Sequence, residues 1–272
     1  MIICADDFGM SEAINRAVLD LVAESKLTAV SCAVSHPSCR AQSVRQLVKC
    51  AQNVDVGLHL VLTSEGRPSA TTCGSLATDG KFHDFGTLLR RSYTRRLNKR
   101  AVRAEITAQY QRFEAMAERP PHFIDGHLHV HQFPVIREAL LDLVCELPPS
   151  RRPYVRNTHM SLGQAMRAGA SLPKTLLIGT PGRTFRRRVT RCGVATNTGF
   201  AGVYNYRPAG KSFKIFAVFL KSLSGPNDML VVHPGLEERW RRREYEALRK
   251  WNAPAGVANR FMWDARLSPN EV

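Results

Sequence analysis

The sequence lacks paired cysteines and long apolar runs. Its seven cysteines are an odd number, are scattered along the chain and form no Cys-X-X-Cys pair, which argues against a disulfide framework or a cysteine zinc site. Apolar stretches such as IFAVFL at 215–220 fall far short of the ~20 residues of a spanning helix. The first residues, MIICADDFGM, contain no basic segment followed by an apolar one, so no signal peptide is expected. We therefore predict free thiols and a cytoplasmic protein.

Acidic residues are scarce relative to basic ones. The 272 residues include 39 Lys+Arg against 23 Asp+Glu, a formal net charge of +16 with histidines neutral. This balance makes nucleic acid, an anionic membrane surface or an acidic glycan a candidate partner. Three basic runs stand out, at 90–100, 183–191 and 239–243, and solvated helix faces are the plain interpretation of each. Few aromatic residues interleave with them, so nucleic acid is not the expected partner.

The hydrophobic pattern predicts an α/β fold. Strands are expected at 1–5, 28–34 and 54–62, with helices beginning at Ser11 and spanning 41–51. This order predicts a parallel sheet with crossover helices, and the length suits one α/β barrel of roughly 250 residues. The further expectations are a loop at 64–86, a basic helix at 87–118, a strand at 122–131, a helix at 134–146, a short strand at 152–156, long loops or a lid at 157–200, a helix at 212–222, a strand at 229–233 and a final helix at 237–250.

Two adjacent carboxylates, Asp6 and Asp7, follow the first apolar strand. Adjacent carboxylates repel each other and resist burial, so each needs a partner. A metal ion for one, and a proton or cation for the other, would supply these partners. The alternative is a solvated turn in which Asp7 caps the following helix.

Two histidines lie at or near the ends of other apolar strands. His59 in VDVGLHLVL shares a strand face with Asp55 and Gly57, and it is either a functional group or a satisfied core residue. His233 in MLVVHPG is followed by a Pro-Gly turn, which places it either as a general acid or base or as a strand-end cap.

The segment DGHLHVH at 125–131 contains the most concentrated histidines. Asp125, His127, His129 and His131 alternate, so a regular strand would point all four the same way. Same-face neighbours would be about 6.6 Å apart at a rise of ~3.3 Å per residue, too far for all of them to bind one ion at the ~2.1 Å of histidine–metal bonds. We expect one ligand here, with neighbours that orient it or meet substrate.

One carboxylate and two imidazoles with open water positions form a pattern for metal-assisted hydrolysis. The ion would lower the pKa of a bound water and polarise a carbonyl. A second carboxylate would take the proton from water, and a histidine would protonate the leaving amine. Two histidines favour Zn, whereas one aspartate with open positions allows Mg, Mn, Co or Ni.

Four segments in this order resemble the YdjC-like carbohydrate deacetylases: ADDFGMSEAIN, VGLHLVLT, DGHLHVHQFP, and VVHPG followed by RREYEALRK. That group includes chitooligosaccharide deacetylases and deacetylases associated with hopanoid biosynthesis. The resemblance spans nearly the whole chain. It implies a distorted (β/α) barrel with mostly parallel strands and long loops, and residues 1–272 as a single metal-dependent deacetylase domain. It also implies one divalent metal ion, Mg or Zn, and hydrolysis of an N-acetyl group from an amino-sugar substrate, an oligosaccharide or glycolipid, with release of acetate.

The resemblance also implies roles for individual residues. It places Asp7, His59 and His127 as the metal ligands, Asp6 as the catalytic base, His233 as a candidate general acid, and Arg156 of the YVRN segment near the catalytic carboxylate. It places His129, His131, Phe200 and Tyr204 at the sugar site. Asn205 stands where the family pattern has an acidic residue.

Two other functions compete with deacetylation. The same metal could serve phosphoester hydrolysis, although the carboxylates near it are few for a two-metal nuclease. The basic runs could instead belong to a non-catalytic module that binds polyanions. A lipid-linked or membrane-adjacent glycan would unite the positive charge with deacetylation and would make the protein membrane-associated. The sequence leaves the oligomeric state open.

Overall fold

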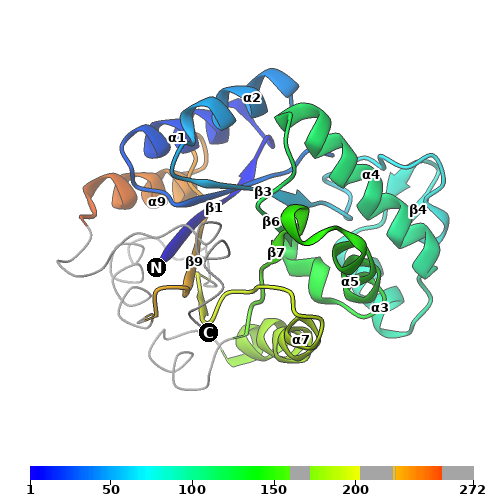
Figure 1. Ribbon diagram of the computed structural model, residues 1–272. Helices are drawn as coiled ribbons and strands as arrows, with labels where there is room; N and C mark the ends of the chain where they lie inside the picture. The colour runs from blue at the N-terminus through cyan, green and yellow to red at the C-terminus, as the bar shows by residue number, and fades with distance from the viewer. Residues whose placement is uncertain (160–171, 203–222, 224, 253–272) are drawn as a thin grey trace.

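The fold is built on a parallel sheet, which we describe from a computed structural model. The described residues are 1–159, 172–202, 223 and 225–252 (Figure 1). In the helix at 172–191, side chains are described from residue 181 onward. Seven strands lie in the order β7-β6-β3-β2-β1-β9-β8, and every pairing between neighbours is parallel. The strands are β1 (Ile2–Phe8), β2 (Ala29–Cys32), β3 (Asp55–Leu60), β6 (Phe123–Gly126), β7 (Tyr154–Val155), β8 (Phe200–Ala201) and β9 (Met229–Val232).

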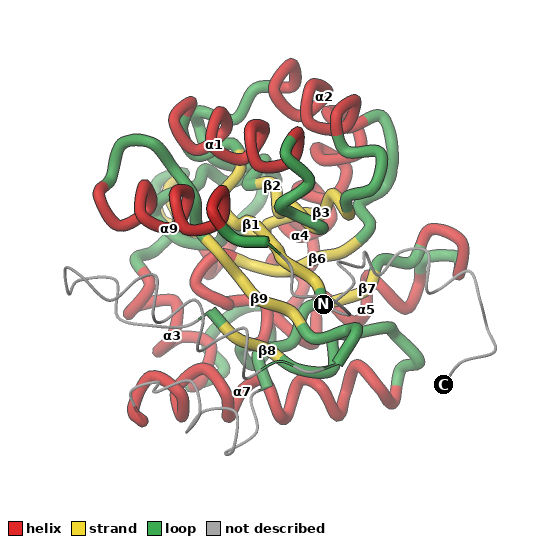
Figure 2. The backbone as a smooth tube through the Cα atoms, turned by 90° about the vertical axis from the view of Figure 1, so that its left-hand side faces the viewer, coloured by secondary structure: helices red, strands yellow, loops and turns green. Residues whose placement is uncertain are grey.

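Helices cover the outside of this curved sheet (Figures 1 and 2). They are α1 (Glu12–Ala23), α2 (Ala41–Cys50), α3 (Phe85–Tyr93), α4 (Lys99–Ala117), α5 (Ile136–Glu146), α7 (Leu172–Arg191) and α9 (Arg239–Lys250). Short elements complete the described chain: the hairpin β4 (Ala77–Thr78) and β5 (Lys81–Phe82), and the 3-10 turns η1 (Gly74–Leu76), η2 (His127–Gln132) and η3 (Pro149–Arg151). No helix in the described ranges has the length and apolar character needed to cross a bilayer.

Strand alternation divides the core into two layers. Ile3 and Ala5 of β1 pack against the helices, in the cluster that also contains Val18 of α1. Ile2 and Cys4 point to the concave side of the sheet. There they meet side chains from five other strands: Ala29, Phe123, Tyr154, Phe200, Met229 and Val231. The concave interior is therefore a packed core beneath the carboxyl ends of the strands.

Hydrogen bonds link the two edges of the sheet. The Val155 amide on β7 donates to the Ala195 carbonyl at 2.9 Å, in the segment that leads to β8. The Asn157 amide donates to Asn197 Oδ1 at 2.8 Å, and Asn197 Nδ2 returns a bond to the Asn157 carbonyl at 2.9 Å. The sheet thus curls into a distorted barrel, and the predicted fold class is confirmed.

Gly57 on β3 makes room for an aromatic stack in this interior. A Cβ at position 57 would lie 2.5 Å from ring carbons of Phe123, which stacks on Tyr154 at a centroid distance of 5.1 Å. Because both rings are fully buried, we expect Gly57→Ala to lower the free energy of unfolding by roughly 1–3 kcal/mol, as overpacking does. Urea denaturation measures this. The double variant Gly57→Ala/Phe123→Leu should lose less than the sum of its single variants, and additive losses would contradict the clash.

The sequence predictions for 64–118 were wrong in detail. The expected loop at 64–86 contains η1, the β4–β5 hairpin and the start of α3. The single helix expected at 87–118 is two helices. Arg95 has a left-handed φ of 54° just past the end of α3, and Asn98 begins α4 by accepting bonds from the amides of Arg100 and Ala101. A strong N-cap inside a basic run thus ends one helix pattern and starts another.

Two other predictions were wrong, and one cannot be compared. The loops expected at 157–200 include the 20-residue helix α7, whose Phe185 and Val189 are fully buried. The strand expected at 122–131 ends at Gly126 and gives way to η2. The helix expected at 212–222 lies outside the described residues.

Candidate metal centre

The end of β1 brings two consecutive carboxylates to one place. Asp6 continues the inward-facing series of Ile2 and Cys4. Asp7 would point outward in a regular strand, but its φ is +68° and the pairing of β1 with β2 shifts register between Ala5 and Phe8. Asp6 and Asp7 are each only 2% exposed. The solvated-turn alternative is therefore wrong, and the strained backbone at Asp7 is of the kind that collects at functional sites.

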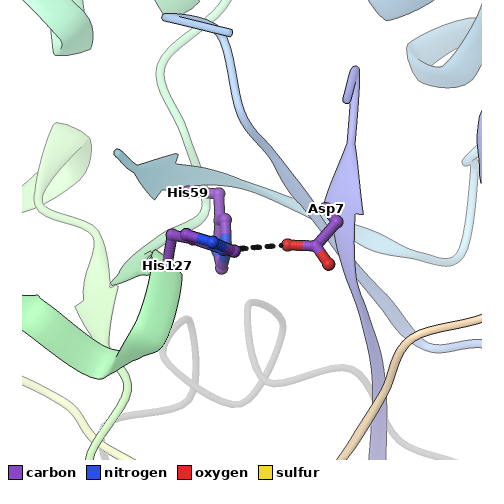
Figure 3. A group of neighbouring side chains, drawn as sticks. All are labelled: Asp7, His59 and His127. Carbon is purple, nitrogen blue, oxygen red and sulfur yellow. Dashed lines mark hydrogen bonds and ion pairs between the residues drawn. The ribbon is translucent and has the colours of Figure 1, made fainter. Parts of the chain in front are cut away.

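Asp7 faces two imidazoles from different elements. Its Oδ1 atom lies 3.1 Å from His127 Nδ1, on η2, and 3.4 Å from His59 Nε2, on β3. One ligand atom from each of the three residues lies within 4.8 Å of the others, and Figure 3 shows both rings turned toward the carboxylate. Burial acts to raise the pKa of Asp7, but its bonds to the two histidines hold it well below the usual value.

His59 is oriented by a carboxylate on the neighbouring strand. Its Nδ1 atom lies 2.7 Å from Asp125 Oδ1, which also accepts a 2.5 Å bond from Ser31 Oγ. Although burial opposes it, the negative charge of Asp125 and Asp6 raises the pKa of His59 to about 10. This pairing turns Nε2 toward Asp7. His59 Nε2 is buried, and its contact with Asp7 Oδ1 is an ion pair at 3.4 Å that lacks hydrogen-bond geometry.

The donor set fits a divalent cation. A buried ring nitrogen that makes no hydrogen bond costs free energy, and His59 Nε2 points at a carboxylate and a second imidazole. Asp125 behind His59 is the arrangement that supports a metal-bound histidine in proteins. A cation placed among Asp7, His59 and His127 would be bound by all three side chains.

Arg156 joins two buried carboxylates beside this cluster. It is fully buried and forms two bonds to Asp6, from NH1 to Oδ2 at 2.8 Å and from NH2 to Oδ1 at 2.7 Å. Its NH2 atom also lies 2.5 Å from Asp125 Oδ2. Burial acts to raise the pKa of Asp6, yet the guanidinium holds it well below its usual range. Asp6 is therefore an ionised carboxylate at neutral pH.

His233 lies at the edge of the same cluster. It follows β9, and its Nε2 atom is 4.0 Å from Asp6 Oδ2. The His233 amide donates to the Glu244 carboxylate on α9, and its ring packs near Trp240. The side chain is 16% exposed, so it stands between the buried carboxylate and solvent.

The histidines after His127 do not share its direction. Leu128 and His129 have left-handed φ values of 51° and 58°, so the chain turns instead of continuing β6, and the predicted alternation is wrong. His131 is fully buried, with Nε2 2.9 Å from the Arg156 carbonyl and its ring edge-on to Phe185. Burial lowers its pKa to about 4. His131 thus lies in the core beneath the site and has no surface for a sugar.

His129 and Phe200 lie together. Their rings meet edge-on at a centroid distance of 5.5 Å, and burial, followed by the charge of Arg156, lowers the pKa of His129 well below the usual value. Phe200 is fully buried on β8. Tyr204 and Asn205 lie outside the described residues.

Arg241 contacts the cluster from α9, so the interpretation of the basic run 239–243 as a solvated helix face is wrong at this residue. Its NH2 atom lies 2.7 Å from Asp7 Oδ2, and its side chain is 10% exposed. The resembling segment RREYEALRK begins one residue later, at Arg242, and nothing in a single sequence connects Arg241 to an aspartate 234 positions away. Ser31 likewise carries no local signal.

Fold and site together define a parallel α/β barrel-like protein with an aspartate–histidine cluster at the carboxyl ends of its strands. A family model described as YdjC-like protein matches residues 1–255. The chain belongs to this family, which confirms the resemblance seen in the sequence.

Curated relatives agree with this placement, and a solved structure shares the fold. The chain is 32% identical over 149 residues to a carbohydrate deacetylase of Danio rerio, covering 54% of this chain and 46% of that protein. It is 31% identical over 146 residues to a chitooligosaccharide deacetylase of Escherichia fergusonii, covering 54% and 56%. The chain thus matches about half the length of these curated relatives. A solved Enterococcus faecalis protein named for cellobiose-phosphate cleavage shares the fold, with a TM-score of 0.68, 19% identity, and coverage of 94% of this chain and 91% of that one.

Proposed function

We propose that this protein is a metal-dependent hydrolase that removes an N-acetyl group from an amino-sugar substrate, an oligosaccharide or glycolipid, and releases acetate. The observation that carries the proposal is the Asp7–His59–His127 cluster beside Asp6, a carboxylate that Arg156 keeps ionised. Relatives named carbohydrate deacetylase and chitooligosaccharide deacetylase support the substrate class. We take residues 1–272 as one domain and the cytoplasm as its location.

The cluster would hold one divalent ion, Mg or Zn. Its ligands would be Asp7, His59 and His127, with Asp125 orienting His59. When bound, such an ion supplies a water of lowered pKa and a polarised amide carbonyl. Arg241 fixes the second oxygen of Asp7, so the first oxygen keeps its direction toward the imidazoles.

The remaining residues handle protons and substrate. Amide hydrolysis adds water across the C–N bond, so one proton leaves the water and one joins the amine nitrogen. Asp6, ionised at neutral pH, would accept the first proton. His233, partly exposed and 4.0 Å from Asp6, would deliver a proton to the leaving amine. His129 beside Phe200 would contact the sugar.

The direct test is acetate release. N-acetylglucosamine oligomers and N-acetylated glycolipids are incubated with the metal-loaded protein, and both acetate and the free amine are measured by mass spectrometry. We expect release by the native protein and none by Asp7→Ala, with metal content determined on the same samples. Metal-loaded protein that releases acetate from no substrate of the panel would refute the proposal.

Arg241→Met should lower the unfolding free energy of the metal-free protein and increase the stabilisation that added metal gives. Removing one partner of a buried ion pair costs about 3 kcal/mol or more in unfolding free energy, and Asp7 then lacks its arginine counter-charge. A divalent ion restores that charge, so added metal should raise the melting temperature of the variant more than that of the native protein.

Arg242→Met is the matched control for Arg241→Met. Arg242 is the next residue on α9, is 64% exposed and pairs only loosely with Glu246 at 3.8 Å. Its loss should change stability by less than about 0.5 kcal/mol and leave the metal response unchanged. Equal effects of the two substitutions would contradict the role of Arg241 at Asp7.

A further inference from the structure

Three arginines from separate helical segments meet around one glutamate. Glu138 lies in the first turn of α5, beside Arg137. Arg95 follows the end of α3, and its NH2 atom lies 3.2 Å from Glu138 Oε1. Arg188 on α7 reaches the same oxygen from NH1 at 3.8 Å. These contacts join α3, α5 and α7 on one side of the molecule (Figure 1), in what we call the arginine cluster: Arg95, Arg137 and Arg188.

Arg137 is a buried cation without a carboxylate of its own. It is 9% exposed. Its NH1 atom makes a long 3.4 Å bond to the Gln132 carbonyl, its Nε has no hydrogen-bond partner, and within the described part of the chain it forms no ion pair. Arg156 and Arg241 are as deeply buried, but each contacts carboxylates. Burial, and next the nearby Arg188, lowers the pKa of Arg137.

The charges of the cluster do not balance. Arg95 and Arg188 both pair with Glu138, and Arg137 pairs with no carboxylate of the described residues. One carboxylate therefore faces three guanidinium groups, which leaves two positive charges without a counter-charge among the described neighbours. A buried cation costs free energy unless it is paired. An external anion would supply the missing charge.

The two outer arginines of the cluster are open to solvent. Arg95 and Arg188 are 62% and 44% exposed, so their side chains can turn toward a ligand while Arg137 stays fixed below. Tyr93, 49% exposed, borders the cluster with its ring on Phe133. Guanidinium groups bind the oxygens of phosphates in pairs, which makes several arginines a specific site for such oxyanions.

We propose that the arginine cluster binds a phosphate-type oxyanion. The site is separate from the metal centre and goes beyond the proposed deacetylation, so its test measures binding alone. The bond from Arg137 to the Gln132 carbonyl connects the cluster to η2, which begins at His127 and ends at Gln132. The anion has two sources with the same chemistry: a phosphate group on a soluble ligand, or the headgroup of an anionic lipid.

Calorimetric titration of the full chain with pyrophosphate tests the site. Arg95→Ala/Arg188→Ala should bind about tenfold or more weakly than the native protein, since each lost arginine removes a charge-assisted bond. The matched control is Arg16→Ala/Arg112→Ala, which removes the same charge from exposed positions on α1 and α4 that form no ion pair with the described residues. The control should stay within about twofold of native. Equal weakening in both variants, or no binding by the native protein to pyrophosphate or to anionic vesicles, overturns the proposal.

Glu138→Gln should increase the affinity for pyrophosphate, whereas the arginine substitutions should lower it. The substitution removes the resident competitor for Arg95 and Arg188, so pyrophosphate should bind about threefold or more tightly. If the arginines instead serve only to hold Glu138, the variant loses stability and gains no affinity, which contradicts the site.

Vesicles then separate the two sources. Co-sedimentation with vesicles of phosphatidylglycerol and phosphatidylcholine is compared with phosphatidylcholine alone. Preference for the anionic vesicles that pyrophosphate abolishes, and that Arg95→Ala/Arg188→Ala lacks, assigns a lipid headgroup. Pyrophosphate binding without vesicle preference assigns a soluble phosphate-bearing ligand. Vesicle preference that persists in Arg95→Ala/Arg188→Ala counts against the cluster.

Discussion

Asp6→Asn is expected to lower kcat for the proposed deacetylation by about 10²–10⁴-fold, the contribution of a positioned general base. The amide has the shape of the carboxylate but does not accept the proton that water must lose. Arg156 keeps Asp125 as a charged partner at 2.5 Å, so the buried guanidinium is not stranded and the variant should fold. The three candidate metal ligands are untouched, so the bound metal should remain.

Asp7→Asn distinguishes the role of Asp7 from that of the neighbouring Asp6. It should lose metal as well as activity, because Asp7 is the only carboxylate of the candidate ligand trio. Metal content by mass spectrometry and kcat by acetate release, measured on both variants, give the comparison. An Asp6→Asn protein that loses its metal, or that keeps more than about a tenth of native kcat, would remove Asp6 from the role of base.

Asp125→Asn should weaken metal binding by about 10–100-fold, the range seen when the partner of a metal-bound histidine is removed. Asp125 Oδ1 accepts a 2.7 Å hydrogen bond from His59 Nδ1 and thereby keeps His59 Nε2 directed at Asp7. An asparagine at 125 can present its NH2 group to the ring and allow the other tautomer. Arg156 would also lose one of its two carboxylates, so stability should fall as well.

Asp55→Asn is the control that distinguishes these two effects. Asp55 is another fully buried aspartate of the interior, at the start of β3, and it accepts a 2.9 Å bond from Tyr154. Its substitution should reduce stability without changing metal affinity. Titration calorimetry with the metal, beside thermal unfolding, measures both quantities. Equal metal affinities of the two variants would contradict the orienting role of Asp125.

The sequence predicts the site best where an apolar strand ends in a polar side chain. Asp6 and His59 lie within two residues of the ends of β1 and β3, and His233 directly follows β9. Parallel strands bring their carboxyl ends to one edge of the sheet. The first strands and helices could be found in the same way, because burial imposes period 2 or 3.6 on the apolar residues. Ser11, for example, caps α1 as expected by accepting a bond from the Ile14 amide.

Sequence patterns do not predict the structure where contacts between distant residues determine it. The alternation from Asp125 to His131 reads as a strand, yet the chain turns at Leu128 and His129 because His131 packs into the core against the Arg156 carbonyl. The segment 172–191 contains two glycines, four threonines and two prolines, which are poor helix formers. Burial of Phe185 accompanies the helix there. Propensity gives way to tertiary packing in both places.

Because Asp6 and Asp7 are adjacent in the chain, the covalent backbone fixes the distance between them. A single trans peptide holds their Cα atoms about 3.8 Å apart, and the left-handed turn at Asp7 brings both side chains inward. His129 and Phe200 instead lie on segments joined to β1 only through the rest of the chain. If these two residues contact the sugar as proposed, insertions or substitutions in their segments would change substrate binding while the spacing of the two carboxylates stays constant. Substrate range and reaction chemistry can therefore diverge independently in proteins built this way.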